Sequence, residues 1–231
     1  MQTITQPPLV YPSSDGKPMA DNTKQFNWIT LIKGNLEILY AQDPGVFVAG
    51  DLLWYPVEGQ PKIAAAPDVM VVFGRPRGDR KSYIQHQENG IAPQVVFEIL
   101  SDANTPMEML RKTNFYSVHG VEEYYVYDPD RNDLEVYLRR GDTLAMVDPL
   151  VFPFVSPHTQ ISFDTWDGEL AIWHPNGRKF ESLMETTQRA EAAEERAEIA
   201  EERAETAGRQ AQRLAEKLRE LGIDPDSISN E

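Results

Sequence analysis

Two apolar segments of the sequence each carry a carboxylate where a buried strand should carry none. Asp68 precedes the run Val69–Phe73, and Glu98 lies inside the run Val95–Leu100. A charged side chain in a buried strand is costly unless it is paired or binds a metal ion. If neighbouring strands bring both carboxylates to one end of a sheet, they form a site for a hard divalent cation such as Mg²⁺ or Mn²⁺. Such a cation can activate water and stabilise charge on a phosphodiester.

A lysine on the next expected helix could complete this site. Lys112 follows Glu98 by 14 residues, and its ammonium group could position water or neutralise developing charge if the helix packs across the sheet. We consider Asp51 and Glu37 as additional acids. Simpler roles stay open: Asp68 could bond a turn at a strand entrance, Glu98 could form a plain salt bridge, and Lys112 could lie at the surface.

Composition limits the kinds of site and protein. The 231 residues include no cysteine, so thiolate metal sites and disulfides are excluded and any metal must be held by oxygen or imidazole. No apolar run approaches the roughly 18 residues of a membrane span. The first residues lack the basic and apolar regions of a signal peptide. We therefore expect a cytoplasmic protein without membrane contact.

The charge balance is unfavourable for nucleic-acid binding, since the formal net charge is −15. From Glu181 onward there are 14 acidic and 7 basic residues, and the remaining 23 acidic and 15 basic residues leave the rest of the chain acidic too. Contact with DNA would need a local basic patch. The best candidate for such a patch is one loop that contains Arg75, Arg77, Arg80 and Lys81. This loop could equally be an ordinary solvated surface loop.

Hydrophobic periodicity predicts a mixed α/β core. Apolar residues recur at three- and four-residue steps between Asn22 and Tyr40, as in an amphipathic helix. A second helix should run from Pro106 to Val118, because Asn104 and Thr105 can cap it. Its expected inward residues are Met109, Leu110, Phe115 and Tyr116. The predicted strands are Val46–Tyr55, Val69–Phe73, Val95–Leu100, Glu123–Asp128, Leu134–Leu138, Leu144–Val147, Ile161–Phe163 and Leu170–Trp173.

The C-terminal part has a different pattern. Ala190, Ala197, Ala204 and Ala211 lie seven residues apart, and a second series runs from Ala193 to Leu214. This heptad repeat predicts a coiled coil with an alanine seam, suited to homodimer formation, although a solvated single helix stays open. We predict a flexible arm at 1–21, an α/β domain at 22–180, a coiled-coil helix at 181–222 and a tail at 223–231.

A set of motifs resembles a known family. They are Pro67-Asp68-Val69, then Val96-Phe97-Glu98-Ile99-Leu100-Ser101, then Lys112, Tyr116, Gly120-Val121, Glu123-Tyr124 and Asp128-Pro129. Together they resemble the Uma2 family, also called DUF820, a large cyanobacterial group. The resemblance implies the restriction-endonuclease-like fold of the PD-(D/E)XK nucleases, a mixed sheet flanked by helices. It covers about Asn22 to Asp128, and more loosely the strands up to Trp173.

The resemblance implies a role for each matching residue. Asp68 matches the aspartate of the PD motif and Glu98 the acid of the (D/E)XK strand. The superfamily's lysine would stand at Leu100, so Lys112 looks like a migrated replacement. Gln25 falls loosely where many members carry a polar residue.

The expected function is Mg²⁺- or Mn²⁺-dependent DNA cleavage. The alternative is a non-catalytic assembly or regulatory protein that keeps the fold and associates through its C-terminal helix. A nuclease acting on RNA or small nucleotides cannot be separated from the first by sequence.

Overall fold

The computed structural model describes residues 10–14, 16, 18–222 and 224. The chain divides into two compact units, Met1–Ser182 and Leu183–Glu231. Of the predicted arm, residues 1–9, 15 and 17 lie outside the described residues, as does the predicted tail except for residue 224. The described part of the arm contacts the first unit: the ring of Tyr11 packs edge-on against Tyr55, whose hydroxyl donates to the Pro12 carbonyl.

A six-stranded mixed sheet forms the centre of the first unit, in the order β1-β3-β5-β6-β7-β8. Within this sheet β5 and β6 are parallel while its other described strand pairs are antiparallel, and α2 connects β5 to β6 as a crossover helix, as predicted. The predicted mixed α/β fold class is therefore confirmed. The strands are β1 (Val46–Gly50), β3 (Val69–Phe73), β5 (Val95–Ile99), β6 (Glu123–Asp128), β7 (Asp133–Arg140) and β8 (Thr143–Met146).

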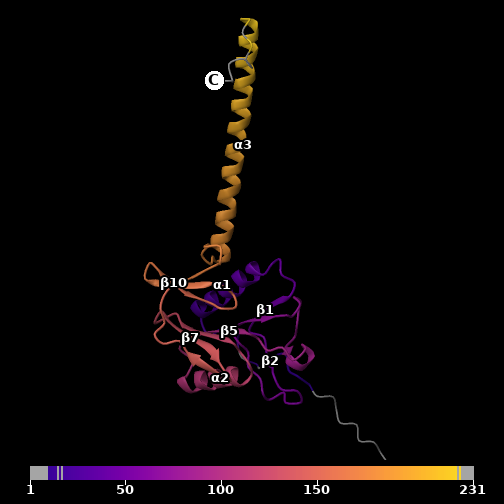
Figure 1. Cartoon of the computed structure of the whole chain (residues 1–231), viewed down its shortest axis with the longest axis vertical. Helices are drawn as coiled ribbons and strands as arrows, with labels where there is room; N and C mark the ends of the chain where they lie inside the picture. The colour runs from indigo at the N-terminus through magenta and orange to yellow at the C-terminus, as the bar shows by residue number, and fades with distance from the viewer. Residues whose placement is uncertain (1–9, 15, 17, 223, 225–231) are drawn as a thin grey trace, which may run out of the picture. The chain divides into compact units, whose positions relative to one another are not determined.

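Each face of this sheet is covered by one helix, as Figure 1 shows. Side chains alternate between the faces along a strand, so Phe97 and Ile99 pack in the cluster that includes α1 (Thr23–Leu39). Val96 lies in the opposite cluster, which includes Tyr116 of α2 (Pro106–Val118). Glu98 shares the parity of Val96, so its side chain points toward α2.

Two smaller sheets complete the unit. In one, β2 (Trp54–Tyr55) pairs in parallel with β4 (Tyr83–Ile84). In the other, β10 (Ser162–Trp166) lies between β9 (Phe154–Val155) and β11 (Glu169–Trp173). This three-stranded sheet supplies side chains to the same core as α1, and β9 was not predicted.

The helix ends follow the predicted capping chemistry. The Asn22 side chain accepts a hydrogen bond from the Gln25 N–H at the start of α1. Thr105 does the same for the Glu108 N–H before α2, and Pro106 occupies the first turn. The helix α2 therefore begins shortly after the end of β5 and packs across the sheet.

Two local predictions were wrong. The predicted strand Val46–Tyr55 breaks after Gly50, since Asp51 adopts a left-handed φ of 47° and its N–H donates to the Pro67 carbonyl. Leu110 was expected to face inward but is 62% exposed. The side of α2 that meets the sheet carries Tyr116 instead, and an offset of six residues places Leu110 away from it.

The second unit contains α3, a helix from Leu183 to Glu220 without a buried residue. Its alanines and glutamates favour helix formation. Among the described residues, no helix is long and apolar enough to cross a membrane.

Candidate active site

The strand register brings the two predicted carboxylates together. Val69 lies opposite Phe97 in the antiparallel pair β3–β5. Carried one residue further, this register places Asp68 opposite Glu98, and opposite residues point to the same face of a sheet. Both side chains are buried. The two acids therefore share the face that α2 covers.

Glu98 receives two donors from α2. One carboxylate oxygen accepts from the Lys112 ammonium at 2.7 Å, and the other accepts from the Tyr116 hydroxyl at 2.5 Å. Lys112 and Tyr116 are four residues apart, so they lie one above the other on the helix. The ion pair of Lys112 with Glu98 is shielded, because Glu98 is only 2% exposed.

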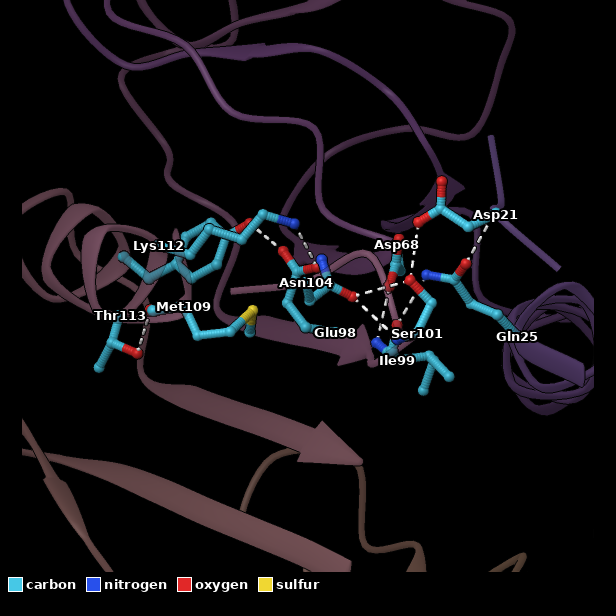
Figure 2. Close-up of polar contacts among 11 residues, drawn as sticks. Asp21, Gln25, Asp68, Glu98, Ile99, Ser101, Asn104, Met109, Lys112 and Thr113 are labelled. Carbon is cyan, nitrogen blue, oxygen red and sulfur yellow. Dashed lines mark hydrogen bonds and ion pairs between the residues drawn. The ribbon is translucent and has the colours of Figure 1, made fainter. Parts of the chain in front are cut away.

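Ile99 connects the second carboxylate to the first helix. Its N–H donates to an oxygen of Asp68 at 2.6 Å, and its carbonyl accepts from the Gln25 side-chain amide at 2.8 Å. Figure 2 shows Asp68 and Gln25 together with Ile99. Gln25 is buried and also accepts from the Asp21 N–H. The backbone beside Glu98 is therefore held by hydrogen bonds to two side chains.

A cavity of about 560 Å³ borders this constellation. Asp68, Lys112, Gln25 and Asp51 line it, whereas Glu98 lies behind Lys112 and Tyr116. The other walls come from residues 18–21, residues 64–66 and the first turns of α2. A substrate entering the cavity would thus meet Asp68 and Lys112 before Glu98.

Burial and the charge of Glu98 affect the ionisation of Asp68, Lys112 and Tyr116. Burial, followed by the charge of Glu98, raises the pKa of Asp68 well above its usual value. Burial acts to lower the pKa of Lys112, but the charge and hydrogen bond of Glu98 outweigh it, and the net pKa is raised. Burial and Glu98 raise the pKa of Tyr116 well above 10.0. At neutral pH Lys112 is therefore charged and Tyr116 is a neutral donor.

These residues fit a divalent cation. Two carboxylates face one ammonium group, so ionising both acids leaves an excess negative charge, which adds to burial in raising the pKa of Asp68. Mg²⁺ is usually held by one or two carboxylates and keeps several waters, and Asp68 and Glu98 provide that number of carboxylates. Among the described residues, no cluster of three or more His, Cys, Asp or Glu side chains could hold a metal ion.

The two additional acids lie in different places. Asp51 lines the same cavity as Asp68, and its charge contributes to the raised pKa of Asp68. Glu37 accepts an ion pair from Lys33 at 2.7 Å and borders a separate, smaller cavity. The structure thus joins Asp51 to the site and leaves Glu37 outside it.

The predicted basic loop is largely engaged in its own contacts. Arg75 and Arg80 both bind Glu88, each at 2.7 Å, with little side-chain exposure. Arg77 donates to the Ala41 carbonyl. Arg77 and Arg80 line the smaller cavity, not the one beside Asp68. Lys81 is exposed. Contact of this loop with DNA stays a prediction.

Sequence reasoning missed several residues of the site. Tyr116 was expected to be only a core aromatic, yet its hydroxyl binds Glu98. The four-residue spacing from Lys112 could have indicated this. Ser101 donates to the carboxylate of Asp21, and its N–H donates to Asn104 (Figure 2). No sequence signal indicates that bond, because the partners are 80 residues apart.

A family model described as "Uma2: Putative restriction endonuclease" matches residues 17–160. The chain belongs to the Uma2 family. This match spans the N-terminal α/β unit from before α1 to the segment before β10, including Gln25, Asp68, Glu98 and Lys112, and confirms the predicted resemblance. The helix α3 lies outside it.

A search of curated proteins finds no match. Among solved structures, the Uma2 chain is similar to one titled as a putative nuclease belonging to DUF820 from Anabaena variabilis ATCC 29413. The two are 17% identical over 63% of this chain and 79% of that chain, with a TM-score of 0.45.

Proposed function

We propose that this Uma2 protein is a Mg²⁺- or Mn²⁺-dependent endonuclease that hydrolyses phosphodiester bonds in DNA. The observation that carries the proposal is the 2.7 Å ion pair between Lys112 and Glu98 beside Asp68, at the wall of an open cavity. The family description supports the reaction class. A buried acid whose pKa is raised, here Asp68, beside a cavity is also a general sign of a functional site.

Asp68 and Glu98 would hold the metal ion. Their oxygens are the hard ligands that Mg²⁺ and Mn²⁺ accept. When bound, the cation would activate water and offset charge on the phosphodiester. The Tyr116 hydroxyl fixes one oxygen of Glu98, and Ile99 fixes Asp68 through its N–H. The protein thus orients both ligands from outside, as metal sites usually require.

Lys112 acts in this proposal as a charge-stabilising group. Its raised pKa keeps it protonated at neutral pH, so it cannot take a proton from water. A fixed ammonium group at the cavity wall can instead stabilise the negative charge that develops on phosphate oxygens. The resemblance places the superfamily's lysine at the position that Leu100 occupies here, and Lys112 would replace it. The side chain of Lys112 thus reaches Glu98 from α2 instead of from β5.

Plasmid cleavage tests the proposal. Supercoiled DNA is incubated with Mg²⁺ or Mn²⁺ and the wild-type protein, Asp68→Ala or Glu98→Ala, and nicking is followed on gels. Metal-dependent nicking that is lost in both variants supports the assignment. Calorimetric titration with Mn²⁺ supplies an independent readout of metal binding.

Other outcomes redirect the proposal. Metal binding without DNA cleavage, together with cleavage of RNA or a nucleotide, would change the substrate and keep the site. Neither cleavage nor metal binding would favour the assembly or regulatory protein, with Asp68 and Glu98 as structural groups.

We propose that α3 pairs with a second copy of the chain. No residue of the helix is buried within one chain, Ile199 and Leu214 are exposed, and the alanine series recurs every seven residues. An alanine seam buries little area, so the pairing should be weak.

Sedimentation of the full chain tests this pairing. Ala200→Glu places a charge in the seam, whereas Ala192→Glu makes the same change outside both alanine series. A dimer that only the seam variant weakens supports the proposal. A monomer at all concentrations overturns it.

A further inference from the structure

A second cation lies beside Lys112 on the wall of the same cavity. The part of α2 that borders the cavity contributes Glu108, Arg111, Lys112 and Phe115. Their spacing of three, four and one residues matches one side of a helix. Arg111 is exposed, so its guanidinium group is available to a molecule that enters the cavity.

Among the described residues, Arg111 differs from Lys112 and from the arginines of the predicted basic loop in having no polar partner. Within the described part of the chain, no carboxylate lies within ion-pair distance of Arg111 and no hydrogen bond joins its side chain. By contrast, Lys112 binds Glu98, and Arg75 and Arg80 both bind Glu88. The guanidinium of Arg111 therefore keeps all its donors for a ligand.

The cavity is lined by more acids than cations, which makes the position of Arg111 important for an anionic ligand. Four acids line it, Asp21, Asp51, Asp68 and Glu108, and among the described lining residues the cations are Arg111 and Lys112. A phosphate group approaching such a wall is repelled unless a cation is placed in its path. Lys112 is already paired with Glu98, so the uncompensated positive charge at the wall comes from Arg111.

We propose that Arg111 binds a phosphate of the nucleic-acid strand next to the phosphodiester to be cleaved, and so positions the strand against Asp68 and Lys112. This rests on the proposed nuclease function. A guanidinium group presents paired donors that match two phosphate oxygens, which an ammonium group does not. Arg111 is a substrate-binding residue of this site, and its loss weakens binding of the strand more than it slows the chemical step.

Kinetics and binding of Arg111→Ala test the proposal. Cleavage of a short fluorescein-labelled DNA duplex with Mn²⁺ gives kcat and KM, and anisotropy in metal-free buffer gives Kd as a function of salt. We expect KM and Kd to rise about tenfold, as for one lost charge-assisted contact. We also expect a nearly unchanged kcat and a salt slope smaller by about 0.9, as for one lost phosphate contact.

Two further variants serve as controls. Arg111→Lys keeps the charge and should recover part of the lost affinity. Arg140→Ala removes an exposed arginine of β7 outside the cavity, and should leave KM and the salt slope close to wild type. Single-stranded DNA and RNA of the same sequence are run in parallel, and the strand type with the largest Arg111 effect identifies the backbone that is bound.

The outcomes separate this inference from the proposed function. If the wild type cleaves DNA and Arg111→Ala has the same KM and salt slope, the role of Arg111 is overturned and the nuclease stands. Equal weakening by Arg140→Ala, or a fall in kcat at constant KM, also overturns it. If the wild type neither binds nor cleaves any of the nucleic acids, both proposals are overturned.

Discussion

Two buried glutamates on neighbouring parallel strands lie in opposite environments. Glu98 of β5 is 2% exposed and Glu123 of β6 is 1% exposed. Glu98 faces α2, where it meets the charged Lys112 and the hydroxyl of Tyr116. A cavity opens on the other side of Lys112. The charge of Glu98 is thus compensated by the ammonium group of Lys112, which also borders the cavity.

Glu123 is enclosed by neutral donors. It accepts from the hydroxyl of Ser156 at 2.5 Å, the N–H of His158 at 2.5 Å and the hydroxyl of Tyr125 at 2.6 Å. These contacts hold residues 156–158 against the sheet. No cation reaches the carboxylate among the described residues. The contrast teaches that burial alone does not distinguish a candidate site residue from a structural acid, whereas a second acid, a cation and a cavity beside Glu98 do distinguish it from Glu123.

The largest expected effect is a difference in DNA cleavage between variants of the two glutamates. Glu98→Gln should lower the rate of plasmid nicking at least about 100-fold, since even groups that only orient a metal ligand change activity 10- to 100-fold. Glu123→Gln should keep the wild-type rate per folded molecule. Nicking assays at a temperature where circular dichroism shows both variants folded check this. Equal loss in both variants would remove the distinction between the two acids.

The second-largest expected effect concerns stability, and here the substitution that matters is at Glu123. Glu123→Gln replaces an acceptor of three hydrogen bonds by an amide with one acceptor oxygen, and should lower the free energy of unfolding by about 2 kcal/mol. Urea unfolding followed by tryptophan fluorescence measures the change. Ser156→Ala, which removes one of the three donors, should cost less. An unfolding midpoint equal to wild type would show that the enclosure of Glu123 contributes little.

A smaller effect is expected from Tyr116→Phe. It removes one hydrogen bond to the charged Glu98 and should lower the free energy of unfolding by about 1.5 kcal/mol. Affinity for Mn²⁺ should fall about tenfold, because Glu98 loses an orienting partner. Calorimetry checks the affinity. Tyr137→Phe is the matched control, since its hydroxyl binds Glu135 away from the cavity, and it should leave Mn²⁺ affinity unchanged.

The smallest expected effect is a gain in the free energy of unfolding. Asp68→Asn keeps an acceptor for the Ile99 N–H and removes repulsion from Glu98, so the metal-free protein should gain about 1 kcal/mol at neutral pH while losing cleavage. The pKa of Asp68 is raised in the fold, so ionisation of Asp68 destabilises the fold as pH rises. The gain should therefore shrink as pH falls and wild-type Asp68 becomes protonated. Thermal unfolding from acid to neutral pH measures it, and a gain that grows toward acid pH would contradict the raised pKa.

The sequence was most informative where local chemistry decides the structure. The helix from Pro106 to Val118 was predicted at both ends, because Thr105 caps it and a glycine follows it. Asp68 and Glu98 stood out because a charge in an apolar strand contradicts burial. The function of these residues stays a prediction, but the structure brings them together.

What the sequence could not provide were contacts between distant segments. The role of Ile99 depends on its backbone, which joins Asp68 and Gln25, and its side chain gives no hint of that. Glu123 lies in an aromatic run much as Glu98 lies in an apolar one, so the two acids could not be separated by pattern. Arg75 and Arg80 were considered as possible DNA contacts, because the sequence does not show that both bind Glu88.

The order of the site's parts along the chain has a consequence for synthesis. The two acids come first, at positions 68 and 98, and the cation that compensates them comes only at position 112, on a helix that must pack back over β5. A nascent chain that ends before α2 contains both acids but lacks both Lys112 and Arg111. The groups proposed to bind the nucleic acid and to stabilise charge, Arg111 and Lys112, are therefore synthesised last, and a polypeptide interrupted before α2 lacks both.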